Sequence, residues 1–219
     1  MIRVRELESF FSGLKFGETV LVEYSSNSYP ELFLKLLHDY ASSKGLHVLV
    51  DDILDTYPTL ARSLEVLGLS TDETIVIKIG GGKLEAGTII SRMEVDKYSI
   101  PFGHYVNSVN KFREANGRYF NPVVGVHKMA MLFSEREMLS LLTTISYFVG
   151  DDRRVSFYLI NEDAIESSKP VFLPLFEEIA TTVTEWYLDG GELVLVVHKA
   201  ANPELLGKEY RVKVSQFFE

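Results

Sequence analysis

Residues 19–30 read Thr19-Val-Leu-Val-Glu-Tyr24-Ser25-Ser-Asn-Ser28-Tyr29-Pro30. The first six form a largely apolar, β-branched run that is too short for a helix, and the polar stretch after them is typical of a loop. Pro30 suits the first turn of a helix, and the residues after it place an apolar face at helical spacing up to about Ser43. This stretch therefore predicts a strand, a loop and a helix, the opening unit of an α/β fold.

The same alternation continues on both sides of this unit. Hydrophobic spacing predicts a short helix before Gly17 and further helices over 57–67, 106–112, 134–148 and, closed by Gly190-Gly191, 172–186. Short apolar runs predict strands over 46–50 (running into Asp51-Asp52), 74–79, 88–95, 122–126 and 155–160, a buried strand of the parallel kind over 192–198, and an edge strand over 210–214. We therefore expect a mostly parallel twisted sheet with helices on both faces, in one domain with an N-terminal helix in 1–16 and a core in 17–219.

Composition narrows the classes of function. The chain has 219 residues, 46% of them hydrophobic, and a net charge of −9, which disfavours nucleic acid and anionic membrane surfaces as partners. It has no cysteine, which excludes disulfides and thiolate metal sites and suits a protein from a hot habitat. Because no apolar stretch reaches membrane-spanning length and the N-terminus is charged, we expect a cytoplasmic protein.

Four stretches, 17–22, 45–52, 154–161 and 191–198, carry a family resemblance. In them the chain resembles the RecA-like nucleotide-binding domains and, among these, the archaeal KaiC-like proteins. It is also similar to a family from hyperthermophilic archaea whose members look like RecA/KaiC domains with an eroded phosphate loop. The resemblance implies a RecA-like three-layer architecture, but it implies no activity.

The loop after Tyr24 departs from the pattern of that family. A phosphate-binding loop needs glycines, a lysine for the terminal phosphates and a hydroxyl for magnesium. On the family pattern these positions fall on Tyr24, Tyr29, Pro30 and Glu31, and no glycine or lysine occurs between Glu18 and Leu34. Pro30 also removes an N–H donor, and Glu31 adds a negative charge. The resemblance therefore implies a degenerate nucleotide site, and we expect no bound cofactor.

Ligands of such sheets bind beyond the carboxyl ends of the strands, so the polar residues there are the candidate site. By resemblance, Asp51 and Asp52 fall where RecA-like enzymes carry the carboxylate that orients water, and Asn161 falls at or next to the magnesium-supporting aspartate. Glu162 and Asp163 lie beyond Asn161. Adjacent carboxylates can share a proton or a cation, but a solvated turn or a helix cap explains this pair more simply. The candidate residues for the ligand crevice are Tyr24, Ser25, Ser26, Asn27, Ser28, Asp51, Asp52, Asn161, Glu162 and His198.

The other candidate motifs are weak. Gly80-Gly-Gly-Lys83 could present N–H groups to an anion, although a flexible turn explains it better. The five histidines (His38, His47, His104, His127 and His198) have no metal-binding spacing, so we expect no metal site. No Gly-x-Ser-x-Gly nucleophile motif occurs in the sequence.

Three hypotheses about function follow. The first is a non-catalytic RecA/KaiC-like domain that acts as a regulatory or protein-interaction module, with a peptide partner or self-association. The second is an atypical nucleotide-binding protein or ATPase that uses Asp51, Asp52, Glu162 and His198 without the usual loop. The third is an enzyme of unrelated chemistry in the same crevice.

Overall fold

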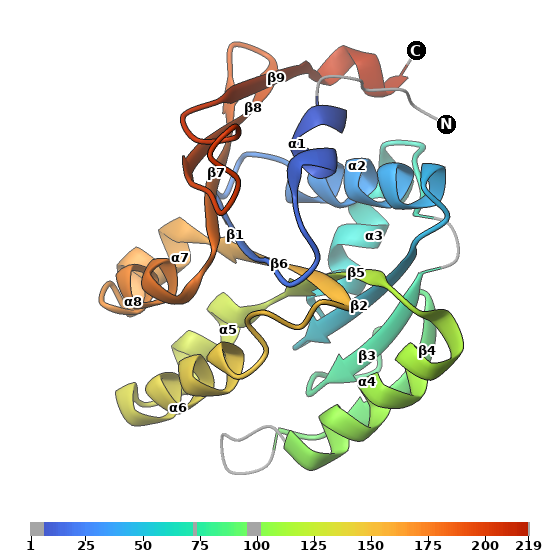
Figure 1. Cartoon of the computed structure of the whole chain (residues 1–219), viewed down its shortest axis with the longest axis vertical. Coiled ribbons are helices and arrows are strands. Elements are labelled where there is room, and N and C mark those ends of the chain that lie inside the picture. Colours follow the sequence, from blue (N-terminus) through green and yellow to red (C-terminus); the bar gives the residue numbers. More distant parts are fainter. Residues whose placement is uncertain (1–6, 72–73, 96–101, 219) are drawn as a thin grey trace.

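The computed structural model describes residues 7–71, 74–95 and 102–218, and its centre is a nine-stranded sheet (Figure 1). The strand order is β4-β3-β2-β5-β6-β1-β7-β8-β9. From β4 to β7 neighbouring strands pair in parallel, and β8 and β9 continue the sheet in antiparallel pairing. The strands are β1 (Thr19–Tyr24), β2 (His47–Ile53), β3 (Ile75–Ile79), β4 (Thr88–Met93), β5 (Tyr119–Val124), β6 (Arg154–Asn161), β7 (Thr182–Asp189), β8 (Glu192–Lys199) and β9 (Glu209–Lys213).

Helices cover both faces of the sheet. Figure 1 shows α1, α2 and α3 on one face and α4 to α8 on the other, and each face has its own cluster of buried apolar side chains. The helices are α1 (Glu8–Gly13), α2 (Pro30–Ser43), α3 (Thr56–Val66), α4 (Phe102–Asn116), α5 (Val126–Leu132), α6 (Glu135–Ser146), α7 (Glu162–Ser168) and α8 (Phe172–Ile179), followed near the C-terminus by the 3₁₀ helix η1 (Val214–Phe218). The expected α/β architecture with a mostly parallel sheet is confirmed.

The opening unit is confirmed to the residue. β1 is buried along its whole length, and α2 begins at Pro30 and ends at Ser43. The edge position of the last strand is also confirmed, because β9 alternates exposed and buried residues at the end of the sheet. Two short helices, α5 and α7, were not predicted from the sequence.

The predicted helix over 172–186 is wrong in its second half. The helix α8 ends at Ile179, and Val183 and Trp186 lie in β7. Val183 packs on the face of α4–α8, whereas Trp186 packs on the face of α1–α3. A strand sends residues of opposite parity to opposite faces, so both side chains are buried although they do not share a helical stripe.

The strand over 192–198 also differs from its expected pairing. β8 is largely buried, as predicted, but it pairs in antiparallel fashion with β7 on one side and β9 on the other. The turn at Gly190-Gly191 joins β7 directly to β8, and both glycines have a positive φ. A tight hairpin of this kind forces antiparallel pairing, and no crossover helix separates the two strands.

Candidate functional site

At two places along the carboxyl edge of the sheet, neighbouring strands send their connections to opposite faces, and we call these places the β1/β6 crevice and the β2/β5 crevice. β1 leads to α2 on one face, whereas its neighbour β6 leads to α7 on the other face. In the same way, β2 leads to α3 and its neighbour β5 leads to α5 on the opposite face. In open α/β sheets ligands bind where adjacent strands send their connections to opposite faces. The β1/β6 crevice and the β2/β5 crevice are therefore the candidate ligand positions of this sheet.

The loop at the β1/β6 crevice is folded on itself. The Ser28 hydroxyl and the Ser28 N–H both donate to the Ser25 carbonyl oxygen, at 2.6 and 3.1 Å. The Ser25 hydroxyl donates to Asn27 Oδ1 at 3.0 Å. Tyr29, the last residue before α2, has a left-handed φ of 52°, a conformation that residues other than glycine adopt at a cost in energy. Internal contacts thus fix the conformation of the loop.

This loop is also tied to the opposite side of the β1/β6 crevice. The Ser26 N–H donates to the Asp163 carboxylate at 2.7 Å, and Asn161 Nδ2 donates to Ser26 Oγ at 3.1 Å. Asn161 Oδ1 accepts from the Ala164 N–H at 2.8 Å, which caps α7. The hydrogen bonds from Ser26 lower the pKa of Asp163. The side chain of Asp163 therefore accepts a backbone N–H of the loop between β1 and α2.

Two further groups at this crevice are an acid and a neutral imidazole. Glu31, in the first turn of α2, is 9% exposed, and burial raises its pKa. The ring of His127 lies edge-on to Tyr24, and burial followed by the charge of Lys128 lowers its pKa to about 4. Neutral imidazole does not attract a phosphate as a cation does.

The β2/β5 crevice is closed by packing and by a second internal carboxylate. A Cβ on Gly125, which follows β5, would collide with the Ile53 carbonyl oxygen and the Thr56 hydroxyl, so the two loops touch directly. Asp55 pairs with Lys78 and accepts the Gly82 N–H. The loop Gly80-Gly-Gly-Lys83 therefore does present an N–H to an anion, but that anion is the protein's own Asp55. Leu54 and Asp55 both have left-handed φ values, 53° and 56°.

Asp51 and Asp52 point to opposite faces of β2 and do not share a proton or a cation. Asp52 accepts the Tyr57 N–H at 2.8 Å, which confirms the helix-cap interpretation for this residue, and lies 3.9 Å from Lys78 Nζ. The solvated-turn interpretation is wrong, because both aspartates lie within the strand and are at most 2% exposed. Successive residues of a strand alternate in direction, which separates the two carboxylates.

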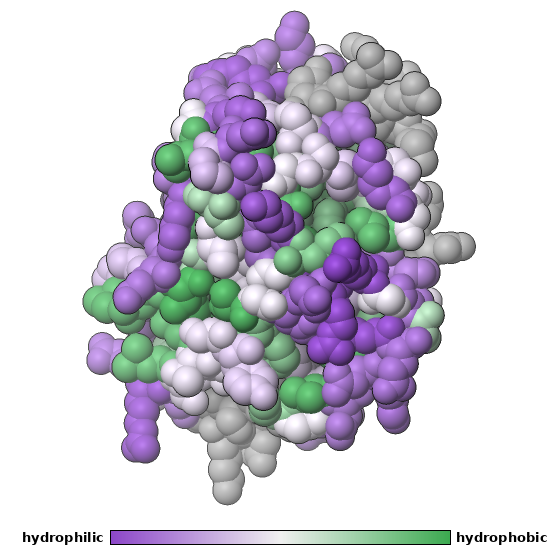
Figure 2. Space-filling model, viewed as in Figure 1, coloured by the Kyte–Doolittle hydropathy of each residue, from purple (hydrophilic) through white to green (hydrophobic). Residues whose placement is uncertain are grey.

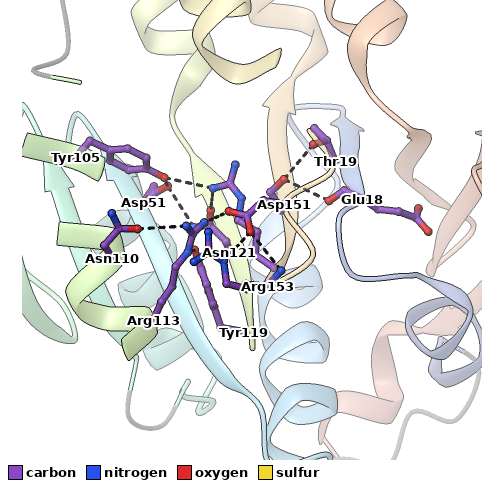
Figure 3. A network of polar contacts seen from close by, with 12 residues as sticks. Glu18, Thr19, Asp51, Tyr105, Asn110, Arg113, Tyr119, Asn121, Asp151 and Arg153 are labelled. Atoms are coloured by element: carbon purple, nitrogen blue, oxygen red, sulfur yellow. Dashed lines mark hydrogen bonds and ion pairs between the residues drawn. The ribbon is translucent and has the colours of Figure 1, made fainter. Parts of the chain in front are cut away.

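Asp51 belongs to a buried polar network under α4 (Figure 3). The Tyr105 hydroxyl and Asn121 Nδ2 donate to Asp51 Oδ2 at 2.7 and 3.2 Å. Arg154, which is 2% exposed, donates to Asn121 Oδ1 at 2.7 Å, and its guanidinium lies 4.8 Å from the ring centre of Phe148. Burial raises the pKa of Asp51 to about 6 against the opposing effects of these partners. The network joins the three neighbouring strands β2, β5 and β6.

Glu162 and His198 lie on the α7/α8 side of the sheet, away from Asp51 and Asp52. Glu162 begins α7, and His198 Nε2 on β8 lies 3.1 Å from Glu185 Oε2 on β7. Two strands, β5 and β6, separate β2 from β1 in the sheet. Of the predicted residues, the structure brings together Tyr24, Ser25, Ser26, Asn27, Ser28 and Asn161 at the β1/β6 crevice, with Glu162 next to it.

Asp55, Asp163, Lys78 and Glu23 were not selected as site residues from the sequence, although Asp163 was noted beyond Asn161. Asp163 and Asp55 each follow a strand by two residues, so their place in the chain was a usable signal. Lys78 and Glu23 are single charged residues within apolar strands, and each is at most 9% exposed. A charge inside a buried strand needs a partner or a shifted pKa, and that requirement could have singled out both residues.

An apolar cavity lies between α6 and the connection from α7 to α8. Its volume is about 310 Å³, and its lining residues include Met138, Leu139, Leu142, Val171 and Leu175. Leu139 and Val171 are 52% and 70% exposed. Figure 2 shows apolar residues gathered at the left of the molecule, where Figure 1 places α7 and α8.

The described residues form neither a metal site nor a membrane-spanning helix. In the part of the chain that the structure describes, no group of three or more histidine or acidic side chains is arranged to hold a metal ion. None of the described helices is long and apolar enough to cross a membrane.

Comparison with known proteins places this fold in a family. The structure is similar to that of PH0250 from Pyrococcus horikoshii, with a TM-score of 0.82 and 35% identity over 92% of this chain and 95% of the other. It is also similar to the KaiC-like protein PH0186 from the same organism, with a TM-score of 0.61 and 14% identity over 91% of this chain and 87% of the other. The second likeness shows the KaiC-like fold alone. No curated protein matches the chain significantly. The family model described as "Pyrococcus protein of unknown function, DUF257" matches residues 9–211, so the chain belongs to the DUF257 family.

Proposed function

We propose that this chain is a non-catalytic member of the RecA/KaiC-like class that acts as a regulatory or protein-interaction module. The observation that carries the proposal is the bridge across the β1/β6 crevice, in which Asp163 accepts the Ser26 N–H at 2.7 Å. An N–H of the loop that would meet a phosphate is thereby bound to an internal anion.

Electrostatics supports the same conclusion. A phosphate in this crevice would approach Asp163 and Glu31, and two unit charges of like sign about 4 Å apart repel by roughly 4 kcal/mol at an effective dielectric constant near 20. Repulsion of roughly 4 kcal/mol would weaken binding by about three powers of ten, and water around the exposed Asp163 reduces this effect. Asp163 has a lowered pKa, so its charge persists at neutral pH.

The apolar cavity between α6 and the α7–α8 connection supports an interaction role. Its exposed rim residues Leu139 and Val171 offer a partner a place to bury an apolar side chain. A peptide segment with a protruding aliphatic or aromatic residue is the partner that this shape fits.

The test is the thermal stability of the purified protein with and without millimolar Mg-ATP, with Mg-ADP and magnesium alone as controls. We expect no change in Tm beyond about 1 °C and no release of phosphate. A ligand present at 100 times its Kd adds about 2.7 kcal/mol of stability, which would raise Tm by several degrees. Such a rise would refute the proposal. If Asp52→Ala then abolished the rise, the atypical nucleotide-binding hypothesis would take its place.

The double variant Glu31→Gln/Asp163→Asn tests whether the charges of Glu31 and Asp163 exclude phosphate. It removes both negative charges from the crevice and keeps the shapes of the side chains. If internal carboxylates are what exclude phosphate, this variant binds Mg-ATP more strongly than the parent protein. Equal absence of binding in both proteins would mean that the missing lysine and glycines suffice.

A further inference from the structure

Four carboxylates meet on the α7/α8 side of the sheet, beside the β1/β6 crevice. Glu23 on β1 stands in register with Glu185 on the adjacent strand β7. The neighbours of Glu23 in β1, Val22 and Tyr24, pack against the opposite core, so Glu23 points toward α7 and α8. Glu162 at the start of α7 and Glu177 on α8 are close enough to act on its charge. We call Glu23, Glu162, Glu177 and Glu185 the carboxylate cluster.

Glu23 forms the buried floor of the carboxylate cluster. It is only 9% exposed, and its Oε1 atom is buried without a hydrogen-bond partner. The other three members are half-buried, and the side chain of Glu185 keeps 35% of its exposure. A buried carboxylate oxygen without a partner is costly, since burial removes its water and nothing replaces it. The cluster is therefore open at its mouth and unsatisfied at its floor.

The described basic side chains near the carboxylate cluster do not pair with Glu23. His198 lies 3.1 Å from Glu185, at the exposed mouth. Lys199 Nζ donates to the carbonyl oxygens of Glu177 and Glu178, at 2.8 and 3.1 Å. Within the described part of the chain, no lysine or arginine lies within ion-pairing distance of Glu23, Glu162 or Glu177.

The titration of Glu23 reflects this environment. Burial, followed by the charges of Glu177, Glu162 and Glu185, raises its pKa from 4.5 to about 8. At neutral pH the floor of the cluster therefore holds a proton in the place of a counter-ion.

We propose that the carboxylate cluster binds an organic ammonium group, with Glu23 at the floor and Glu177 and Glu185 beside it. The described residues do not have the arrangement of a metal site, so an organic cation is the better match. An ammonium is compact and has three donors, which suits one buried carboxylate oxygen with other carboxylates beside it, whereas a guanidinium is a wide planar fork. Both a lysine side chain of a partner and a free alkylamine carry this group.

This inference deepens the proposed function, because it names a chemical group that the module recognises next to its closed crevice. The two can fail separately. Binding of Mg-ATP would refute the proposed function and leave amine binding untouched, and the absence of amine binding would leave the closed crevice in place.

Calorimetric titration of the whole protein with n-butylamine and with Nα-acetyl-lysine N-methylamide tests the proposal. Because the ammonium must replace the proton on Glu23, affinity should rise about thirtyfold between pH 6.5 and 9.0, while the amine itself stays mostly charged. Titrations at neutral pH in two buffers of different ionisation enthalpy should show close to one proton released per ammonium bound. Binding of the blocked lysine identifies a protein side chain as a fitting source, and binding of butylamine alone identifies a small molecule.

Glu23→Gln tests whether Glu23 supplies the charge that binds the ammonium. The glutamine keeps the shape of the side chain and is neutral, like the protonated acid. It should lose at least tenfold in affinity at pH 9.0 and most of the pH dependence. Glu178→Gln is the control variant. It removes one charge from α8, the helix that carries Glu177, but outside the carboxylate cluster, so it should bind the amine as the parent protein does. The proposal is overturned by an absence of binding at tens of millimolar amine, by equal affinity at the two pH values, by equal losses in the two variants, or by tighter binding of butylguanidine. The proton count uses the unmodified protein and does not depend on the folding of a variant.

Discussion

Glu23→Gln should stabilise the protein, and increasingly so as the pH rises. The pKa of Glu23 is raised from 4.5 to about 8 in the folded chain, first by burial and then by the neighbouring carboxylates. Below pH 4.5 the group is protonated in both the folded and unfolded states, so it contributes no penalty. Between pH 4.5 and about 8 the unfolded chain releases this proton and the folded chain keeps it, so stability falls as pH rises. Above pH 8 the penalty is complete and constant.

The size of the effect follows from the shift in pKa. A rise from 4.5 to about 8 corresponds to roughly 5 kcal/mol if the group were wholly shielded. The mouth of the carboxylate cluster is open to water, which screens the charges of Glu162, Glu177 and Glu185, so we expect about 2 kcal/mol. For a chain of this length, about 2 kcal/mol raises Tm by roughly 4 to 8 °C.

The assay is urea unfolding at pH 4.5, 6.5 and 8.5. Urea is preferable to guanidinium, which is a salt that screens charges and a cation that could enter the cluster. The free energy of unfolding of Glu23→Gln should match the parent at pH 4.5 and exceed it at pH 8.5. Glu178→Gln, on the exposed side of α8, should stay within about 0.5 kcal/mol of the parent at every pH. A constant difference between Glu23→Gln and the parent at all three pH values would refute the linkage to Glu23, and so would a loss of stability at pH 8.5.

Two further substitutions test the core of the sheet and the β2/β5 crevice. Arg154→Leu should lower the free energy of unfolding by about 3 kcal/mol, measured with urea, because it leaves the buried Asp51 network without its cation. The double variant Asp51→Asn/Arg154→Leu should recover part of that loss. If it recovers nothing, the loss comes from packing alone. Gly125→Ala should cost roughly 2 kcal/mol or more, since Gly125 has a φ of +97° and its new Cβ would collide with Ile53 and Thr56. Gly150→Ala, with a φ of +87° and open space around its Cβ, isolates the backbone strain and should cost less.

The sequence predicted local structure best where two signals agreed. Over 19–43 the β-branched run, the polar loop and Pro30 all indicated the same boundaries, and these boundaries are the observed ones. Over 172–186 the apolar spacing indicated one helix, because Val183 and Trp186 continue the spacing of Phe172 and Phe176. The β-branched and aromatic residues of 181–188 favoured a strand instead. The strand forms because it packs against a core on each of its two faces.

The candidate site was predictable in its place but not in its contacts. The polar residues after β1 and β6 lie together because those strands are neighbours in the sheet. Asp51 and Asp52 looked equivalent in the sequence, yet strand alternation places one in a buried network and the other at a helix cap. Pairings such as Ser26 with Asp163 join residues far apart in the chain, so no local pattern could indicate them.

The charges at the carboxyl edge of the sheet are inverted relative to a phosphate site. A phosphate site presents free N–H groups and cations to an anion. Here Asp163 and Asp55 already accept N–H groups at Ser26 and Gly82, and Lys78 is paired with Asp55. The Ser26 and Gly82 N–H groups and Lys78 therefore have partners, whereas Glu23 Oε1 has none. An edge that carries an unpaired acid favours a cation over an anion as its ligand, so a change of ligand class is part of what we propose for this chain.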